Sequence, residues 1–325
     1  MTKRDELTID PSDPRVKAAR SAEERLHRHH HLSCTEHRIE LDEPEIRIRV
    51  LEAGRGAPVI LMPGGIGDAW IWSSLMGHME GFRMIAVNRP GGGLSDGVDH
   101  RDVDLRTLAT DTLSAVLDHF ELTSAPIIAN SMGGLWSFWF ALDRPERVRA
   151  LAQVGTPALI LGTSAPLPMR LQSIPGLNRL LVKLMVPKNL EQARDLPTFL
   201  GHPESVGEEW PEAAAACSYH FSRLPTFTTS WLSLMERVLT PTGAEADVRI
   251  EEEELRQVSQ PTLFLWGSGD PFGSLEVARR AERAVPDARL LEVGVGHLPW
   301  WDEAGECARL IEKFFSDKAE AVNPD

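Results

Sequence analysis

Three side chains that could together perform nucleophilic catalysis each follow a short apolar run. They are Ser131, Asp270 and His297, and the runs before them cover residues 125–129, 262–266 and 289–293. An aliphatic hydroxyl is a poor nucleophile until an imidazole removes its proton, and the imidazolium then formed needs a carboxylate to hold its orientation. This chemistry would assign attack to Ser131, proton transfer to His297 and orientation of the imidazole to Asp270.

Ser131 stands between an apolar run and a helical pattern, which is typical of a sharp strand-to-helix turn. Such a turn exposes the hydroxyl at the edge of a sheet, and it requires small residues two before and two after the serine because strand and helix nearly touch. Ala129 and Gly133 meet this requirement. A serine at the start of any glycine-rich helix gives a similar local pattern, so the wider sequence must decide.

The chain resembles the α/β-hydrolase family over about residues 37–317, apart from an insertion. The segment Ala129–Gly134 is similar to the family's nucleophile elbow. In that family the serine, the acid and the histidine occur in this order, on loops that follow strands. The resemblance implies an α/β fold of the α/β-hydrolase type, with a mostly parallel sheet, helices on both faces and an inserted helical cap. It also implies that Ser131, Asp270 and His297 form a triad.

An oxyanion hole should accompany such a triad, because attack on a carbonyl places negative charge on its oxygen. We expect the backbone N–H of Met132 to be one donor. The segment Pro63–Trp72 resembles the family's oxyanion loop, although Pro63 stands where the family usually has histidine. The resemblance implies Gly65 as the second donor and Gly64 as the residue that permits close approach.

A second glycine-rich segment, Asn88–Asp96, resembles another conserved loop of the family, with Asn88 in the usual aspartate place. We interpret it as a buried turn that braces the active-site loops. A phosphate-binding role is not indicated, because the segment lacks the lysine of a P-loop.

Apolar runs and helical patterns alternate along most of the chain, which indicates a parallel sheet with crossover helices. Two segments with alternating apolar and charged residues, 37–42 and 45–51, predict antiparallel strands near an edge. Buried strands are predicted at 58–62, 83–87, 125–129, 151–154, 261–266 and 288–293. Helices are predicted at 105–120, 135–140, 275–284 and 307–315.

The rhythm of strands and helices divides the chain into three parts. Residues 36–160 and 255–325 are predicted to form the core domain, and residues 161–254 a helical cap. Residues 1–35 are predicted to be a polar N-terminal arm. The histidine cluster at 27–31 is expected on a solvated surface helix, since no carboxylate or cysteine is spaced to complete a metal site.

The cap should supply apolar walls to a substrate pocket. Predicted substrate contacts are Gly64, Asn130, Trp72, Trp210, Trp231 and Leu298. Further candidate lining residues in the cap are Met169, Leu171, Leu180, Leu184, Met185, Phe221, Phe227 and Met235. His202 and His220 are expected to be structural or surface residues. Arg170, Arg179 and Lys183 leave open a substrate that carries a carboxylate.

Composition restricts the partners. The formal net charge of −14 should repel nucleic acid and anionic lipid, so neither a nucleic acid nor a membrane is an expected partner. Three dispersed cysteines offer no disulfide framework, and no signal peptide or membrane span is recognised, so a cytoplasmic protein is expected. No cofactor and no metal are expected. The oligomeric state stays open.

Several functions fit these residues. The leading hypothesis is a serine hydrolase, carboxylesterase-like, that cleaves a small hydrophobic ester, thioester or lactone. The elbow residues Asn130–Gly134 also resemble those of meta-cleavage-product hydrolases, which cleave carbon–carbon bonds, but Leu298 stands where those enzymes usually have tryptophan. A lyase, a perhydrolase or a ligand-binding receptor with the same triad are the remaining alternatives.

Overall fold

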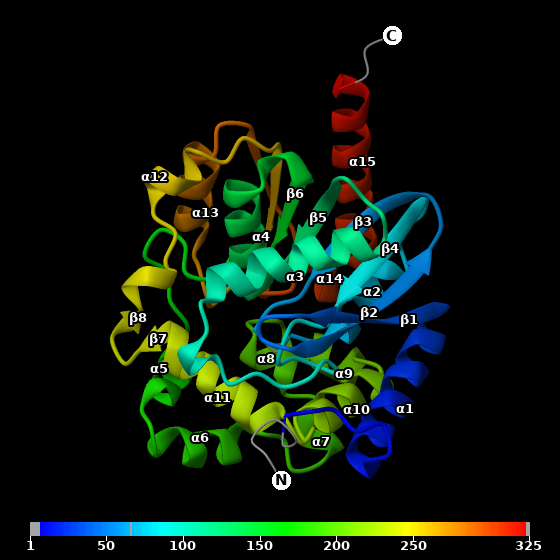
Figure 1. Ribbon diagram of the computed structural model, residues 1–325, viewed down its shortest axis with the longest axis vertical. Coiled ribbons are helices and arrows are strands. Elements are labelled where there is room, and N and C mark those ends of the chain that lie inside the picture. Colours follow the sequence, from blue (N-terminus) through cyan, green and yellow to red (C-terminus); the bar gives the residue numbers. More distant parts are fainter. Residues whose placement is uncertain (1–6, 66, 323–325) are drawn as a thin grey trace.

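The predicted apolar runs form the strands of one central sheet. A computed structural model describes residues 7–65 and 67–322, and within them eight strands pair in the order β1-β2-β4-β3-β5-β6-β9-β10 (Figure 1). The strands are β1 Cys34–Leu41, β2 Ile46–Gly54, β3 Ala57–Met62, β4 Phe82–Val87, β5 Ala125–Ala129, β6 Val148–Val154, β9 Thr262–Trp266 and β10 Ala288–Glu292. The pairs β1–β2 and β2–β4 are antiparallel and the remaining pairs are parallel. The predicted α/β-hydrolase fold is therefore confirmed.

Helices cover both faces of this sheet. One face packs on α3 (Leu105–His119), α4 (Met132–Asp143) and α13 (Leu275–Ala284). The other packs on η1 (Ala69–Trp72), α2 (Ser73–Met76), α14 (Pro299–Asp302) and α15 (Ala304–Val322). Short 3₁₀ turns occur at η2 (His100–Asp102) and η3 (Pro145–Arg147). Burial on both faces explains the continuous apolar strands, but β10 is half-exposed because it forms the sheet edge.

The segment between β6 and β9 is almost entirely helical, and Figure 1 shows its helices α6–α11 grouped at the lower end of the molecule. They are α5 Leu167–Arg170, η4 Leu171–Ser173, α6 Leu177–Met185, α7 Leu190–Ala193, α8 Leu196–Phe199, α9 Glu204–Glu209, α10 Glu212–Phe221 and α11 Phe227–Val238. A small hairpin, β7 (Leu239–Thr240) and β8 (Gly243–Ala244), is followed by η5 (Ala246–Val248) and α12 (Glu252–Leu255). We refer to residues 161–254 as the cap, as predicted from the sequence. No helix in the described part of the chain is long and apolar enough to cross a membrane.

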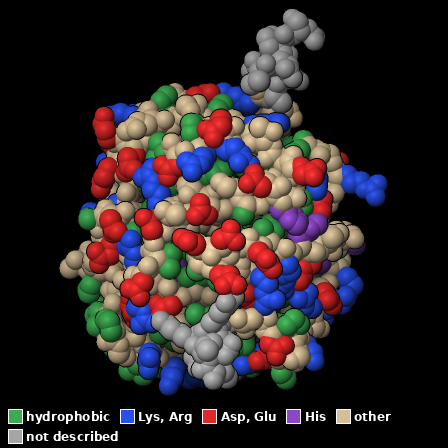
Figure 2. Space-filling view, in the orientation of Figure 1, with side chains coloured by type: hydrophobic (Ala, Val, Ile, Leu, Met, Phe, Trp, Pro, Cys, Tyr) green, Lys and Arg blue, Asp and Glu red, His purple; other side chains and the backbone are tan. Residues whose placement is uncertain are grey.

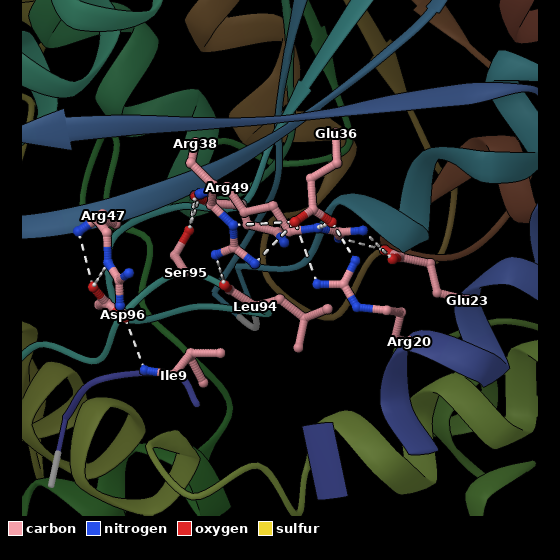
Figure 3. A network of polar contacts seen from close by, with 11 residues as sticks. Ile9, Arg20, Glu23, Glu36, Arg38, Arg47, Arg49, Leu94, Ser95 and Asp96 are labelled. Carbon is pink, nitrogen blue, oxygen red and sulfur yellow. Dashed lines mark hydrogen bonds and ion pairs between the residues drawn. The ribbon is translucent and has the colours of Figure 1, made fainter. Parts of the chain in front are cut away.

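The prediction of a solvated surface helix for the histidine cluster is only partly right, because Arg28, His29 and His31 are exposed but the helix itself is docked on the protein. Helix α1 (Pro14–His29) buries an apolar face against α10, and His27 of the histidine cluster is buried with it. Figure 3 shows a second contact of α1, with the sheet, where the buried guanidinium of Arg49 on β2 pairs with Glu23 of α1 and with Glu36 of β1. Residues 1–6 of the predicted arm lie outside the described residues.

Candidate active site

Ser131 lies in the turn between β5 and α4, in a backbone conformation that residues other than glycine rarely adopt. Its φ is 51° and its ψ is −117°, outside the regions that an L-residue prefers. The turn also brings α4 against the neighbouring strand, because a Cβ on Gly133 would lie 2.2 Å from the carbonyl oxygen of Met62. The small residue expected two positions after the serine is thus required by close packing.

A buried imidazole–carboxylate pair lies across the sheet edge from this turn. Asp270 follows β9 and His297 follows β10, and Nδ1 of His297 lies 2.8 Å from Oδ2 and 3.0 Å from Oδ1 of Asp270. The ring of Phe272 stacks on the imidazole with centroids 4.1 Å apart. The carboxylate therefore selects the tautomer with the proton on Nδ1 and leaves Nε2 as the base.

The carboxylate of Asp270 is held from its other side by Thr156, which follows β6. The backbone N–H and the hydroxyl of Thr156 donate to Oδ2 at 2.9 and 2.7 Å, and the N–H of Phe272 donates to Oδ1 at 2.8 Å. Burial disfavours the ionised carboxylate, but the facing imidazole and these donors outweigh it, so the pKa of Asp270 falls below its ordinary value of 3.8.

The two halves of the predicted triad meet at one cavity. Ser131 and His297 both line it, and Nε2 of His297 is buried without a hydrogen-bond partner among the described residues. A buried nitrogen without a partner destabilises the fold, and a catalytic role explains why it is kept. This arrangement can remove a proton from a hydroxyl and return it to a leaving group.

The predicted oxyanion loop approaches the serine closely. A Cβ on Gly64 would lie 2.7 Å from Oδ1 of Asn130 and 3.1 Å from Cβ of Ser131, so only glycine fits there. Gly64 and Gly65 line the cavity. Met132 is the first residue of α4, so its N–H has no partner within that helix and is available to an anion.

The buried guanidinium of Arg89 holds this loop in place. It donates to the carbonyls of Pro63, Gly64 and Gly65 over 2.7–3.2 Å, and it lies 5.0 Å from the ring centroid of Trp136. The predicted bracing role of the Asn88–Asp96 segment is confirmed. Because the carbonyls of the oxyanion loop face Arg89, the N–H groups of that loop can point towards the cavity.

The cavity has a volume of about 520 Å³ and lies between the sheet edge and the cap. Most of its wall is apolar, and Lys188 is the single Lys or Arg among the described residues that line it. Asp68 also lines it, with the indole N–H of Trp70 donating to Oδ2 at 3.1 Å. Burial raises the pKa of Asp68 to about 8, so the neutral acid predominates at pH 7.

The predicted substrate contacts divide into two groups. Gly64, Asn130, Trp231 and Leu298 line the cavity, as do Met169, Leu184, Met185, Phe221 and Phe227. The side-chain amide of Asn130 has a structural role, because its nitrogen donates to the carbonyls of Val154 and His297 at 2.7 and 3.1 Å.

The remaining predicted contacts lie elsewhere. Trp72 is wrong as a pocket residue, because its ring stacks on Trp300 in the core, with centroids 4.2 Å apart. Trp210 is also wrong, since it lies behind Trp70 and Trp301, which line the cavity in its place. Six cap residues that the sequence analysis named also do not line the cavity: Leu171, Leu180, Met235, Arg170, Arg179 and Lys183.

His202 of the cap contributes to the site in a way that the sequence did not reveal. Its Nδ1 lies 2.7 Å from Oδ1 of Asp302, and its Nε2 accepts the backbone N–H of Leu298 at 3.3 Å. A Cβ on Gly296 would lie 2.4 Å from the imidazole ring. His202 thus holds the loop that carries His297. The residues next to His202 in the sequence give no pattern from which this contact could be predicted.

Metal ligation is not suggested by the side chains. Among residues 7–65 and 67–322, no group of three or more His, Cys, Asp or Glu is arranged to hold a metal ion. Cys34, Cys217 and Cys307 are free thiols.

Comparison with known proteins identifies a matching family and relatives that are hydrolases. The family model described as alpha/beta hydrolase fold matches residues 57–304. The chain is 28% identical to a 2-hydroxy-6-oxononadienedioate/2-hydroxy-6-oxononatrienedioate hydrolase of Cupriavidus pinatubonensis, over 85% of this chain and 92% of that protein. It is also 28% identical to a 2-hydroxy-6-oxo-6-phenylhexa-2,4-dienoate hydrolase of Burkholderia cepacia, over 83% of this chain and 92% of that protein.

Solved structures support the same fold. A meta-cleavage product hydrolase from Pseudomonas fluorescens superposes with a TM-score of 0.68 at 21% identity, covering 86% of this chain and 97% of that one. A carboxylesterase from Bacillus subtilis superposes with a TM-score of 0.69 at 15% identity, covering 94% of this chain and 99% of that one.

Proposed function

Because this chain belongs to the α/β-hydrolase fold family, we propose that it is a serine hydrolase that cleaves an uncharged, hydrophobic ester, thioester or lactone. One observation carries the proposal. Ser131, on a strained turn, shares an apolar cavity of about 520 Å³ with a buried His297–Asp270 pair. Strain at a cavity-facing serine is typical of a preorganised nucleophile.

In the proposed mechanism, Oγ of Ser131 attacks the carbonyl carbon while Nε2 of His297 takes the hydroxyl proton. Asp270 keeps the imidazole oriented and stabilises its positive charge. The N–H groups of Met132 and Gly65 bind the oxyanion. Collapse of the tetrahedral intermediate expels the leaving group, which receives the proton from His297. Water, activated by the same imidazole, then hydrolyses the acyl-enzyme and restores Ser131.

The wall of the cavity supports an uncharged substrate. A carboxylate held inside would meet the side chain of Asp195 on the described wall, with Lys188 as the one basic side chain. Burying an unpaired anion is costly, whereas the many apolar side chains stabilise an acyl chain. This lining favours acyl compounds without charge.

Carbon–carbon bond hydrolysis is the second candidate, and the relatives at 28% identity favour it. Their names describe hydrolases of oxo-dienoates, and the same triad chemistry can cleave a bond next to a ketone. Against it, Leu298 follows His297 here, and the cavity offers the carboxylate of such a substrate little positive charge.

Steady-state turnover of nitrophenyl esters from acetyl to long acyl chains tests the proposal, with Ser131→Ala as the control. We expect Ser131-dependent hydrolysis with a clear optimum of chain length. A 2-hydroxy-6-oxo-dienoate is assayed in parallel by loss of its absorbance. Faster Ser131-dependent cleavage of the dienoate than of every ester would replace the proposal with the second candidate.

A further inference from the structure

Exposed apolar side chains gather on one part of the cap. Of the eight large hydrophobic side chains exposed in the described residues, seven lie between residues 167 and 199. They are Leu167, Leu177, Leu180, Leu184, Met185, Leu190 and Phe199. Single exposed leucines need no explanation, but several within one segment, of which Leu184, Met185 and Phe199 also line the cavity, indicate an interaction surface.

Helix α6 is the centre of this group. It turns Asn178 and Val182 inwards, and Nδ2 of Asn178 donates to Glu236 of α11. The side chains of Leu180 and Leu184 point outwards and are 56% and 65% exposed. Because residues three and four apart share one face of a helix, Leu177, Leu180 and Leu184 form a single stripe. We call this stripe, with Arg179 and Lys183 beside it, the α6 surface.

The charge of this segment is opposite to that of the whole chain. Between Leu167 and Phe199 the sequence contains five basic residues (Arg170, Arg179, Lys183, Lys188 and Arg194) and two acidic ones (Glu191 and Asp195), although the formal net charge of the chain is −14. Figure 2 shows hydrophobic and basic side chains together at the lower left, where α6 lies in Figure 1. Leucines flanked by Lys and Arg are typical of helices that lie on anionic lipid.

The α6 surface is continuous with the entrance of the cavity. Leu184 and Met185 of α6 belong to the cavity wall, and so do Lys188 and Phe199. These four side chains are exposed as well, so they lie at the rim. A partner bound to the α6 surface would therefore also contact the entrance of the cavity.

From this continuity we propose that the α6 surface docks on an anionic lipid surface, which delivers a hydrophobic acyl substrate to the cavity from the lipid. Charge complementarity favours lipid over a second copy of the chain, because a two-fold contact would bring Arg179 and Lys183 against their own counterparts. The net charge of −14, which argued against a membrane partner, describes the whole molecule rather than this face. Delivery of substrate rests on the proposed hydrolase function, whereas docking does not.

The test is cosedimentation of the full chain with vesicles of phosphatidylcholine alone or mixed with phosphatidylglycerol. We expect binding to the anionic vesicles, loss of binding at high salt, and weak binding to phosphatidylcholine. The double variant Arg179→Gln/Lys183→Gln should bind about 25-fold more weakly, since each basic residue near such a surface contributes about a fivefold factor. Leu177→Ser/Leu180→Ser should also weaken binding, by at least about tenfold.

A matched control is Arg279→Gln/Arg283→Gln, an exposed pair with the same spacing on α13, which should bind as the native chain does. None of these side chains lines the cavity, so turnover of a soluble short-chain ester should not change. Absence of vesicle binding by the native chain, or equal binding by all variants, would overturn the proposal. So would a native dimer that Leu177→Ser/Leu180→Ser dissociates, because it assigns the surface to a second copy. Vesicle binding without turnover of any ester would refute the proposed function alone.

Discussion

The imidazole of His202 joins the cap to the loop that carries the predicted catalytic base. Its Nε2 accepts the N–H of Leu298 at 3.3 Å, so its proton resides on Nδ1 and is donated to Asp302 at 2.7 Å. The adjacent N–H of His297 donates to the carbonyl of Leu200 at 2.8 Å. Two consecutive N–H groups of the loop are therefore held by the cap.

Substitutions of His202 should separate its two contacts. In His202→Asn the side chain can still donate to Asp302 but no longer reaches Leu298, whereas the longer amide of His202→Gln can still accept from Leu298. We expect His202→Asn to lower kcat about 10–100-fold with little change in KM, because the base is misplaced. His202→Gln should keep most of the activity. Native kcat in both variants, or equal losses that follow a drop in Tm, would reduce His202 to a packing residue.

Thr156 should support catalysis by stabilising the ionised carboxylate of Asp270. Thr156→Val removes the hydroxyl donor 2.7 Å from Oδ2 and keeps the backbone donor. Loss of a donor to the ionised form raises the pKa of Asp270. We expect kcat to fall about 3–10-fold, because a less firmly held carboxylate orients the imidazole less well.

The lowered pKa of Asp270 determines how the stability of the fold changes with pH. The stability that this carboxylate contributes is present above its unfolded pKa and is lost as pH falls through the folded value. Thr156→Val should therefore begin to lose stability at a higher pH than the native chain, as measured by Tm against pH. Thr156→Ser, which restores the hydroxyl, is the control, and identical profiles for Val and Ser would contradict the assignment.

Arg89 should be required for the shape of the oxyanion loop. Arg89→Met would leave the buried carbonyls of Pro63, Gly64 and Gly65 without their donor, at a cost of about 3–5 kcal/mol in the free energy of unfolding. We expect kcat to fall about 10²-fold or more as the donors to the oxyanion move. Arg89→Lys should recover little, since an ammonium cannot reproduce the fork of donors. Denaturant titration and ester turnover measure the two effects, and an unchanged kcat would place the oxyanion hole elsewhere.

The parts of the site that follow from chain order could be predicted from the sequence. Parallel strands end at one edge of the sheet, so residues just after β5, β9 and β10 had to meet. Ser131, Asp270 and His297 are examples, and Gly133 shows that local packing rules apply as well.

Contacts between distant loops could not be predicted in this way. Nothing in the sequence specifies that the 3₁₀ turn of η1 directs Trp72 onto Trp300 and Trp70 towards the cavity. His202 and Asp302 are similarly far apart in the chain, and α1 gives no local sign that Glu23 will meet a buried Arg49. Such pairings depend on how the cap and the helix dock, which periodicity does not report.

Asp68 should lower the stability of the native chain at neutral pH. Burial raises its pKa from 3.8 to about 8, so between these values the unfolded chain is ionised while the folded chain is not. The stability associated with this group is therefore complete below pH 3.8 and is lost progressively up to about pH 8. Asp68→Asn has no such ionisation and keeps an oxygen for the indole N–H of Trp70. We expect its Tm to exceed that of the native chain at pH 7 and the difference to vanish near pH 4. A difference in Tm that is constant over this range would show that the carboxyl is ionised in the folded protein.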